Sequence, residues 1–547
     1  MSDISFSNKN RKERLRQSLD KVYDLIIIGG GITGAGIALD GALRGLSVLL
    51  VEKKDFASGT SSKSTKLIHG GLRYLKQLEF GLVKETGQER AVVHQNIPHL
   101  VHPEKMLLPI VKDGTFSKFS ASIAISVYDR LAKVADEDRK VTFNKEETLK
   151  EEKLLNHKLL KSGIQYSEYR TDDARLTIEI VKAARREGAE AFNYVKVTDF
   201  VYEQGKVRGI LCKDLSDDTQ LTFHAKQVVS AAGPWVDKLR EINNSKKGKS
   251  LQLTKGVHIV LPFDKLPLKH SVYFDAFDGR MLFAIPRGKI TYIGTSDTNY
   301  TGDKDRVLCT TADAEYILAA TNTMFEVGTV MTEDIISTWA GLRPLIHEDG
   351  KSPSELSRKD EIFESETDLI SIAGGKLTGY RKMAERIIDL VQEKNSSLTQ
   401  GSCKTKDYKI HSDSFSNYKD FHSYKNGIVT EYGDNGITEY EAWYYVTTYG
   451  KHAKVIIEAA IGSDLSIEKA LIQKEIEYSI QHESSIMPDD YFNRRTGRIY
   501  FDIYSVKDHL DFIIEEFATH FNWDDSKSQE IKSKSQSYID DITIIKS

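Results

Sequence analysis

A glycine-rich turn between two apolar runs constrains the fold of this chain more than any other feature. The run VYDLIII comes directly before GGGITG at 29–34, and a helical stretch and a second strand-like run, SVLLVE, follow. Gly29, Gly31 and Gly34 satisfy the pattern G-x-G-x-x-G between a strand and a helix. The pattern therefore predicts a βαβ unit that opens a Rossmann-like α/β domain.

The spacing of these residues predicts a dinucleotide site. Gly29 permits the tight turn, Gly31 lets a pyrophosphate approach the backbone, and Gly34 lets helix and strand pack closely. Glu52 ends the second strand, 21 residues beyond Gly31. A carboxylate at this place accepts hydrogen bonds from the hydroxyls of a ribose and repels a 2′-phosphate. These residues do not separate FAD from NAD.

The segment that follows the second strand, DFASGTSSKSTKLIHGGLRYL at 55–75, is rich in small hydroxyl residues and glycine. Serine and glycine offer hydrogen bonds without bulk, which suits a backbone that wraps closely around a cofactor. We therefore expect cofactor contacts from Thr60, Ser61, Ser62, Ser64, Thr65, Lys66, Leu67, Gly70 and Gly71.

The rest of the chain predicts two further parts. Strand-like runs alternate with charged helical segments up to about residue 373, which is typical of a mixed-sheet domain interleaved with the first one. A helical pattern over 380–391 is followed by a linker-like stretch at 395–407. We therefore expect domains at 1–400 and 401–547, the second one helical.

Composition narrows the class of protein. The 547 residues are 40% hydrophobic and 29% charged, which is typical of a globular protein. The net charge of −4 provides no overall positive charge that would attract nucleic acid. Three scattered cysteines predict neither a disulfide framework nor a metal site. We find no apolar run long enough to span a membrane and no secretory signal, so we expect a cytoplasmic protein.

Leu15, Leu19 and Val22 recur at helical spacing in a basic N-terminal stretch. This stretch predicts a short amphipathic helix that either packs on its own domain or lies on an anionic membrane surface. Peripheral attachment to the inner face of the cell membrane therefore stays open.

Several longer motifs resemble one family. They are the glycine turn with its extension to DFASGTSS, STKLIHGGLRYL, DDARL, AAGPWVD, KGVHIV, IGTSD, GLRP, GGKLTGYRKMAE and HESSIMPDDYFNRRTGR. Nearly the whole chain is similar to the FAD-dependent, aerobic glycerol-3-phosphate dehydrogenases of the D-amino-acid-oxidase-like flavoprotein superfamily. The resemblance implies FAD as cofactor, oxidation of glycerol 3-phosphate to dihydroxyacetone phosphate, a quinone as electron acceptor, and a homodimer as a plausible assembly.

The resemblance also implies a set of substrate residues. Arg73, Tyr74 and Arg358 are expected at the phosphate end, and Arg343, His258 and Lys376 near the reacting carbon. We favour His258 as the base, because a neutral imidazole accepts a proton near pH 7 whereas an arginine stays protonated. His69 is the alternative base.

Further cofactor contacts are expected outside the first βαβ unit. In this superfamily a second glycine turn, here Gly374, Gly375, Leu377 and Thr378, brings backbone N–H groups toward the flavin. Ala232 and Gly233 follow the strand-like run QVVSA and are expected near the adenine, where the backbone of Val197 offers hydrogen bonds.

Three other functions are considered. The oxidases of this family pass electrons to oxygen and release hydrogen peroxide, but they carry an inserted segment that we do not find here. A flavin-binding protein without turnover would lack part of the arginine set. An NAD-linked dehydrogenase fits the glycine turn but not the GTSS, HGGLRYL and GGKLT motifs.

Overall fold

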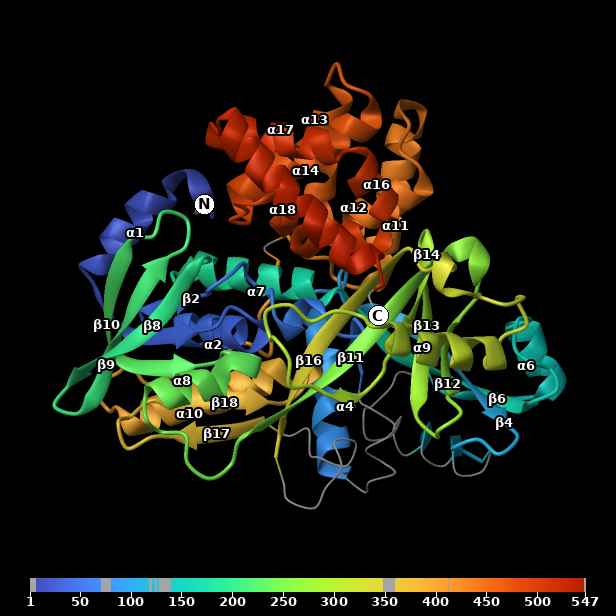
Figure 1. The fold of residues 1–547 in the computed structure, drawn as a ribbon, viewed down its shortest axis with the longest axis horizontal. Helices are drawn as coiled ribbons and strands as arrows, with labels where there is room; N and C mark the ends of the chain where they lie inside the picture. The colour runs from blue at the N-terminus through green and yellow to red at the C-terminus, as the bar shows by residue number, and fades with distance from the viewer. Residues whose placement is uncertain are drawn as a thin grey trace.

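Two β-sheets and a cap of helices make up the protein (Figure 1). The computed structural model describes residues 6–69, 80–117, 121–122, 125–126, 139–347, 360–411 and 413–545. In Figure 1 the first sheet lies on the left, the second on the right, and the C-terminal helices lie above both.

The first sheet is built around the predicted βαβ unit. Its strand order is β17-β18-β10-β1-β2-β7, with β9 paired to β10 and β8 to β9. Strands β1, β2, β7, β10 and β18 are parallel, as expected for a Rossmann-like domain. The bounds are β1 Val22–Ile28, β2 Val48–Val51, β7 Glu190–Phe192, β8 Val195–Glu203, β9 Lys206–Asp214, β10 Gln220–Ser230, β17 Asp360–Glu364 and β18 Ile370–Gly374.

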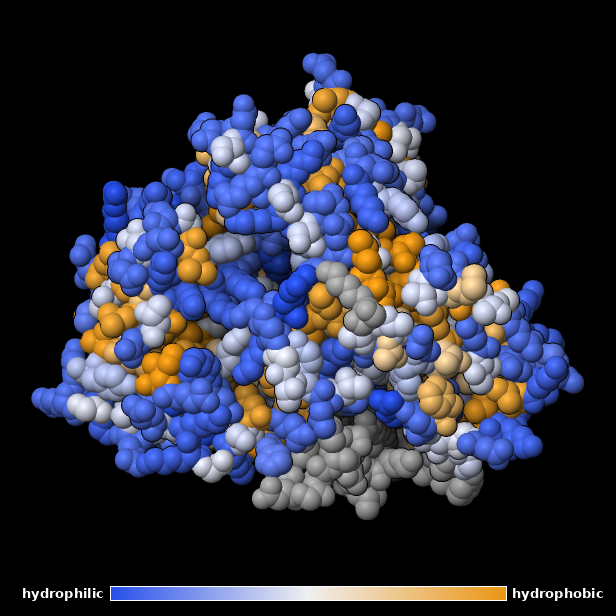
Figure 2. All heavy atoms as spheres, in the orientation of Figure 1, coloured by the Kyte–Doolittle hydropathy of each residue, from blue (hydrophilic) through white to orange (hydrophobic). Residues whose placement is uncertain are grey.

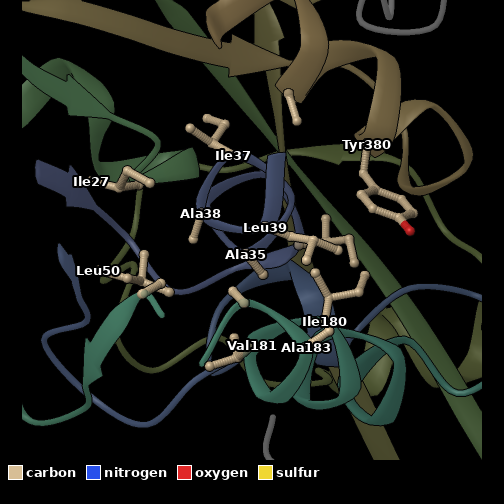
Figure 3. Packing of buried hydrophobic residues seen from close by; sticks show 14 of the residues in the cluster. Ile27, Ala35, Ile37, Ala38, Leu39, Leu50, Ile180, Val181, Ala183 and Tyr380 are labelled. Carbon is tan, nitrogen blue, oxygen red and sulfur yellow. The ribbon is translucent and has the colours of Figure 1, made fainter. Parts of the chain in front are cut away.

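Helices α2 (Ile32–Leu43), α7 (Asp173–Arg186) and α10 (Tyr380–Lys394) contribute to the core beside this sheet. Figure 3 shows side chains of α2 between those of the strands, Ile27 and Leu50, and those of α7, including Val181. All three side chains are fully buried. Burying a side chain of this size stabilises the fold by about 1.5–3 kcal/mol, so this layer holds the glycine turn on a rigid base.

The second sheet is mixed and alternates with the first along the chain. Its strand order is β15-β11-β14-β13-β12-β4-β6-β3, with β16 paired to β11 and β5 to β6. The bounds are β3 Leu67–Ile68, β4 His102–Val111, β5 Val141–Asn144, β6 Leu160–Arg170, β11 Leu251–Pro262, β12 Ser271–Asp275, β13 Met281–Arg287, β14 Ile290–Gly294, β15 Thr298–Asn299 and β16 Ser337–Ile346. Helices α6 Lys145–Glu151 and α9 Thr311–Met324 flank this sheet, and α4 Phe80–Asn96 contributes to the cores of both sheets. Helix α8 Val236–Ile242 packs on the first sheet.

The C-terminal part is helical, as predicted. Its helices are α11 Tyr418–Tyr432, α12 Glu439–Tyr449, α13 Ala453–Ile461, α14 Ile467–His482, a π-helical turn Asp490–Arg495, α15 Arg498–Phe501, α16 Ile503–Asp508, α17 Leu510–Phe521 and α18 Asp525–Thr543. One hydrophobic cluster joins Tyr292 and Trp339 of the second sheet to Tyr500 and Phe517 of these helices. The C-terminal helical domain (α11–α18) therefore packs onto the second sheet through a shared core.

The basic N-terminal stretch packs on its own domain. Helix α1 (Arg11–Leu19) buries Leu15, and Arg11 pairs with Asp214 at 2.6 Å. The helical spacing predicted that Val22 belongs to this helix. Val22 instead begins β1 and is 67% exposed. In the described residues no helix combines the length and apolar character needed to cross a membrane. The face in Figure 2 is largely hydrophilic, with smaller hydrophobic patches.

Two buried histidines link the first domain to the linker before the C-terminal helices. The ring centroids of His99 and His411 lie 5.4 Å apart. Burial lowers the pKa of His99 to about 4 and that of His411 well below its usual value, so both imidazoles are neutral in the folded protein. Unfolded histidine titrates near 6.5, so the unfolded chain takes up more protons as the pH falls below this value.

We therefore expect the free energy of unfolding to fall as the pH decreases from about 6.5 toward 4. A His99→Phe variant should show a shallower decrease, by up to about 1.4 kcal/mol per pH unit, in denaturant titrations at several pH values. His157→Phe is the control, because the His157 side chain is 56% exposed. Equal slopes for the wild type and His99→Phe would contradict the prediction.

Candidate functional site

The glycine turn brings β1, β10 and α2 into close backbone contact. Gly29 has φ +114°, and a Cβ atom there would lie 2.6 Å from the carbonyl oxygen of Ala231. A Cβ atom on Gly34 would lie 1.9 Å from the carbonyl oxygen of Gly29. Neither position admits a side chain, so only glycine there lets β1, β10 and the start of α2 approach this closely.

Glu52 lies beside this turn, at the end of β2. Its two carboxylate oxygens accept backbone N–H groups, from Gly30 at 2.8 Å and from Lys54 at 2.9 Å. Burial raises the pKa of the Glu52 carboxyl. A carboxylate can accept about four hydrogen bonds, so Glu52 can still accept hydrogen bonds from hydroxyl groups.

A cavity of about 580 Å³ extends from this turn toward the second sheet. This volume lies within the range of cofactor sites, about 300–1,000 Å³. The predicted site residues that line it are Gly29, Gly31, Glu52, Thr60, Ser61, Ser64, Val197, Ala232, Gly233, Gly374, Gly375, Lys376 and Leu377. The two glycine turns and the hydroxyl-rich segment, far apart in sequence, therefore meet at one cavity.

Residues 53–66, which we call the cofactor segment, cross the cavity wall. The Ser61 hydroxyl accepts the N–H of Ile32 at 2.9 Å, and Thr60 Oγ1 donates to the carbonyl of Leu342 at 2.7 Å. The segment thus joins the start of α2 to β16 of the second sheet.

Several predicted cofactor residues support the wall without lining the cavity. Lys66 is 1% exposed, and its Nζ donates to Asp173 at 2.6 Å and to the carbonyl of Ser62 at 3.2 Å. Thr378 Oγ1 donates to the carbonyl of His69 at 3.1 Å, which ties the second glycine turn to β3. Thr65, Leu67 and Gly34 also lie outside the lining.

His258 is buried near the cofactor segment. It lies on β11, where its ring stacks on Trp339 of β16 at a centroid distance of 4.7 Å. Its Nε2 lies 3.0 Å from Thr65 Oγ1. Burial, with the nearby Arg343 charge, holds the pKa of His258 well below its usual value. The imidazole is therefore neutral at pH 7.

Arg343 lies next to His258 on the neighbouring strand. Its guanidinium donates to Asp297 at 2.9 Å and to Thr295 Oγ1 at 3.0 Å. It crosses directly over Gly256, where a Cβ atom would lie 2.5 Å from Arg343 Nη2. Neither Arg343 nor His258 lines the cavity, whereas Lys376 does.

Part of the predicted site lies outside the described residues. These positions are Gly70, Gly71, Arg73, Tyr74 and Arg358. The predicted phosphate-binding residues therefore stay predictions. Among the residues that the structure describes, no group of three His, Cys, Asp or Glu side chains is placed to hold a metal ion.

Comparison with known proteins gives the family. The model of the FAD dependent oxidoreductases matches residues 24–370, and that of the C-terminal domain of alpha-glycerophosphate oxidase matches residues 365–528. The chain belongs to the FAD-dependent oxidoreductases. The family resemblance and the fold class predicted from the motifs are thus confirmed.

Relatives of this FAD-dependent oxidoreductase match it over nearly its full length. The aerobic glycerol-3-phosphate dehydrogenase of Bacillus subtilis is 48% identical over 532 residues, which cover 96% of each chain. That of Staphylococcus haemolyticus is 46% identical, over 99% of this chain and 98% of its own. The X-ray structure of the glycerol-3-phosphate dehydrogenase from Bacillus halodurans complexed with FAD has a TM-score of 0.84 and 40% identity, and covers 98% of both chains.

FAD is the cofactor of this oxidoreductase, and the cavity residues fit it. Gly29 and Gly31 line the cavity at the start of α2, where a pyrophosphate would fit, and Glu52 provides an acceptor for ribose hydroxyls. Which residue contacts which FAD atom stays a prediction.

The oxidoreductase cavity also has lining residues that our sequence analysis missed. Lys53 Nζ lies 2.7 Å from Asp305 and 3.9 Å from the centroid of the Trp235 ring, and all three residues line the cavity. Trp235 stands in the AAGPWVD motif, and Lys53 directly follows Glu52, so both had a local signal. Asp305 had none, because its turn reaches the cavity only through the fold.

Proposed function

We propose that this oxidoreductase oxidises sn-glycerol 3-phosphate to dihydroxyacetone phosphate and passes the electrons to a quinone. The observation that carries the proposal is the match, at 46–48% identity over nearly the whole chain, to relatives named aerobic glycerol-3-phosphate dehydrogenase. Bound FAD supplies the hydride acceptor for such a reaction.

The residues near the cavity offer the remaining chemistry. Oxidation of a secondary alcohol removes a hydride from C2 and a proton from its hydroxyl. We assign His258 as the base, because its buried ring is neutral and a neutral imidazole accepts a proton. His69 is the alternative base. Lys376, at the cavity, and Arg343, beside His258, are proposed to bind and orient the substrate oxygen atoms.

The phosphate end is assigned to Arg73, Tyr74 and Arg358. Arginine suits this task because its planar guanidinium binds phosphate oxygens in pairs. A quinone acceptor brings with it a site at the membrane surface, so the proposal includes peripheral attachment to the inner face of the cell membrane. The assembly proposed is a homodimer.

Anaerobic mixing of the purified yellow protein with sn-glycerol 3-phosphate tests this function. The flavin absorbance near 450 nm should bleach within one turnover, and a soluble quinone should restore it quickly while air restores it slowly. Rapid recovery in air with release of hydrogen peroxide would instead support the oxidase. Absence of bleaching in FAD-loaded protein would overturn the substrate assignment.

A further inference from the structure

The C-terminal helical domain holds the cofactor segment at both of its ends. The segment begins at the end of β2 and leads into β3, and its middle residues line the cavity. Side chains of the π-helical turn and of α15 reach its two ends, at Asp55 and at Lys66.

At the first end, two arginines enclose a buried carboxylate. Asp55 is fully buried, and Arg495 donates to its two oxygens at 2.6 and 2.8 Å. Arg494 Nε also donates to Asp55, and its Nη2 donates to Asp490 at 2.6 Å. Burial alone would raise the pKa of Asp55, but the two arginines hold it well below its usual range. The carboxylate is therefore ionised and depends on these partners.

Asp55 is tied to the glycine turn through the next two residues. The N–H of Ala57 donates to the carbonyl of Gly30 at 2.9 Å. The Phe56 ring packs so closely on the turn that a Cβ atom on Gly30 would lie 2.6 Å from its Cδ1. A displacement of Asp55 would therefore be transmitted to the turn that faces the cofactor.

At the second end, aromatic rings of the C-terminal domain surround a lysine. Lys66 Nζ lies 5.7 Å from the ring centroid of Tyr500 and 5.5 Å from that of Phe501. Both distances are within the range of cation–π attraction. Because the same Nζ donates to the Ser62 carbonyl, these rings act on the part of the segment next to the cavity.

We propose that Arg494 and Arg495 are positioning residues that act through Asp55 to hold the cofactor segment against FAD. The C-terminal helical domain thereby sets how tightly the oxidoreductase retains its cofactor. Neither arginine lines the cavity, so any effect on FAD is expected to pass through Asp55. Loss of one partner of a buried ion pair leaves an uncompensated charge, which the segment relieves by opening toward water.

The rate of FAD release tests this proposal on the full-length, FAD-loaded protein. Release is followed as the rise in flavin fluorescence after dilution into buffer. We expect Arg495→Lys and Asp55→Asn to release FAD about tenfold faster or more, the effect of losing a supporting contact behind a binding group. The visible flavin spectrum should shift in the same variants, which a general loss of stability would not produce.

Arg498→Lys is the matched control. Arg498 lies three residues beyond Arg495 and its side chain is only 11% exposed; its guanidinium donates to Glu475 at 2.7 Å inside the C-terminal domain. Its release rate should stay within about twofold of the wild type. Equal acceleration in Arg498→Lys and Arg495→Lys would overturn the proposal, because the effect would then come from domain stability.

The double variant Asp55→Asn/Arg495→Lys provides a second criterion. If both side chains act through one contact, the double variant should release FAD about as fast as the faster single variant. Fully additive effects on the logarithm of the rate would overturn the proposal. A wild-type release rate in Asp55→Asn would also overturn the proposal. This side chain has a similar shape, and the substitution changes no residue of the C-terminal domain.

Discussion

A Gly34→Ala variant is expected to be isolated as a nearly colourless protein with little bound FAD. The added Cβ atom would lie 1.9 Å from the carbonyl oxygen of Gly29, and both partners of this clash are backbone. Helix α2 must therefore move away from β1, which takes its N-terminal amides away from the pyrophosphate. Overpacking in a core costs about 1–3 kcal/mol, which corresponds to an affinity loss of about 5-fold to 150-fold, and we expect the upper end of this range at this rigid site.

The ratio of flavin to protein absorbance, together with FAD titration of the apo-protein, measures this loss. Gly427→Ala is the control, because Gly427 lies within α11 and a Cβ atom there would meet nothing within 4 Å. It should bind FAD normally and gain up to about 1 kcal/mol of stability. A yellow Gly34→Ala protein with wild-type FAD affinity would falsify the assigned role of this turn.

A His258→Ala variant is expected to keep its FAD and lose most of its turnover. If His258 takes the hydroxyl proton, its removal should lower kcat for glycerol 3-phosphate by about 100-fold to 10,000-fold. Stopped-flow measurement of flavin bleaching at saturating substrate isolates the chemical step from substrate binding. His520→Ala, in the last turn of α17, should bleach at the wild-type rate.

The pH dependence of the same step provides a separate criterion. The pKa of His258 is well below 6.5, because burial and the Arg343 charge disfavour the imidazolium. Lowering the pH from 8 to 6 therefore leaves the base neutral, and the bleaching rate at saturating substrate should not fall with a midpoint near 6.5. A near-wild-type bleaching rate in His258→Ala would exclude His258 as the base and favour His69.

Local sequence patterns predicted the glycine turn well, because backbone geometry alone determines which residues can stand there. Gly29 and Gly34 stand where only a missing side chain allows the strand, turn and helix to meet, so their spacing is readable without the fold. Glu52 follows from the same unit, because it ends the strand beside the turn. At Val22 two patterns overlapped: the strand-like run VYDLIII is confirmed as β1, whereas the helical spacing from Leu15 and Leu19 does not extend to Val22.

The roles of Lys66 and Asp305 were not readable from local patterns. Lys66 stands in a hydroxyl-rich run that predicts cofactor contact, but its ammonium turns to Asp173, on a helix more than a hundred residues away. Asp305 lies in a turn of the second domain and reaches Lys53 only because the two sheets are interleaved. For Lys66 a charge pair across the fold overrides the local composition signal, whereas for Asp305 there is no local signal to read.

The sequence by itself determined the βαβ unit, its glycine turn and the position of Glu52 beside that turn. Those features depend on contacts within about thirty residues, where spacing fixes geometry. Only the tertiary structure decided that Asp55 is held by Arg495, 440 residues later in the chain, and that His258 is neutral. Both depend on burial and on partners that no local pattern specifies, because desolvation and charge pairing belong to the packed protein as a whole.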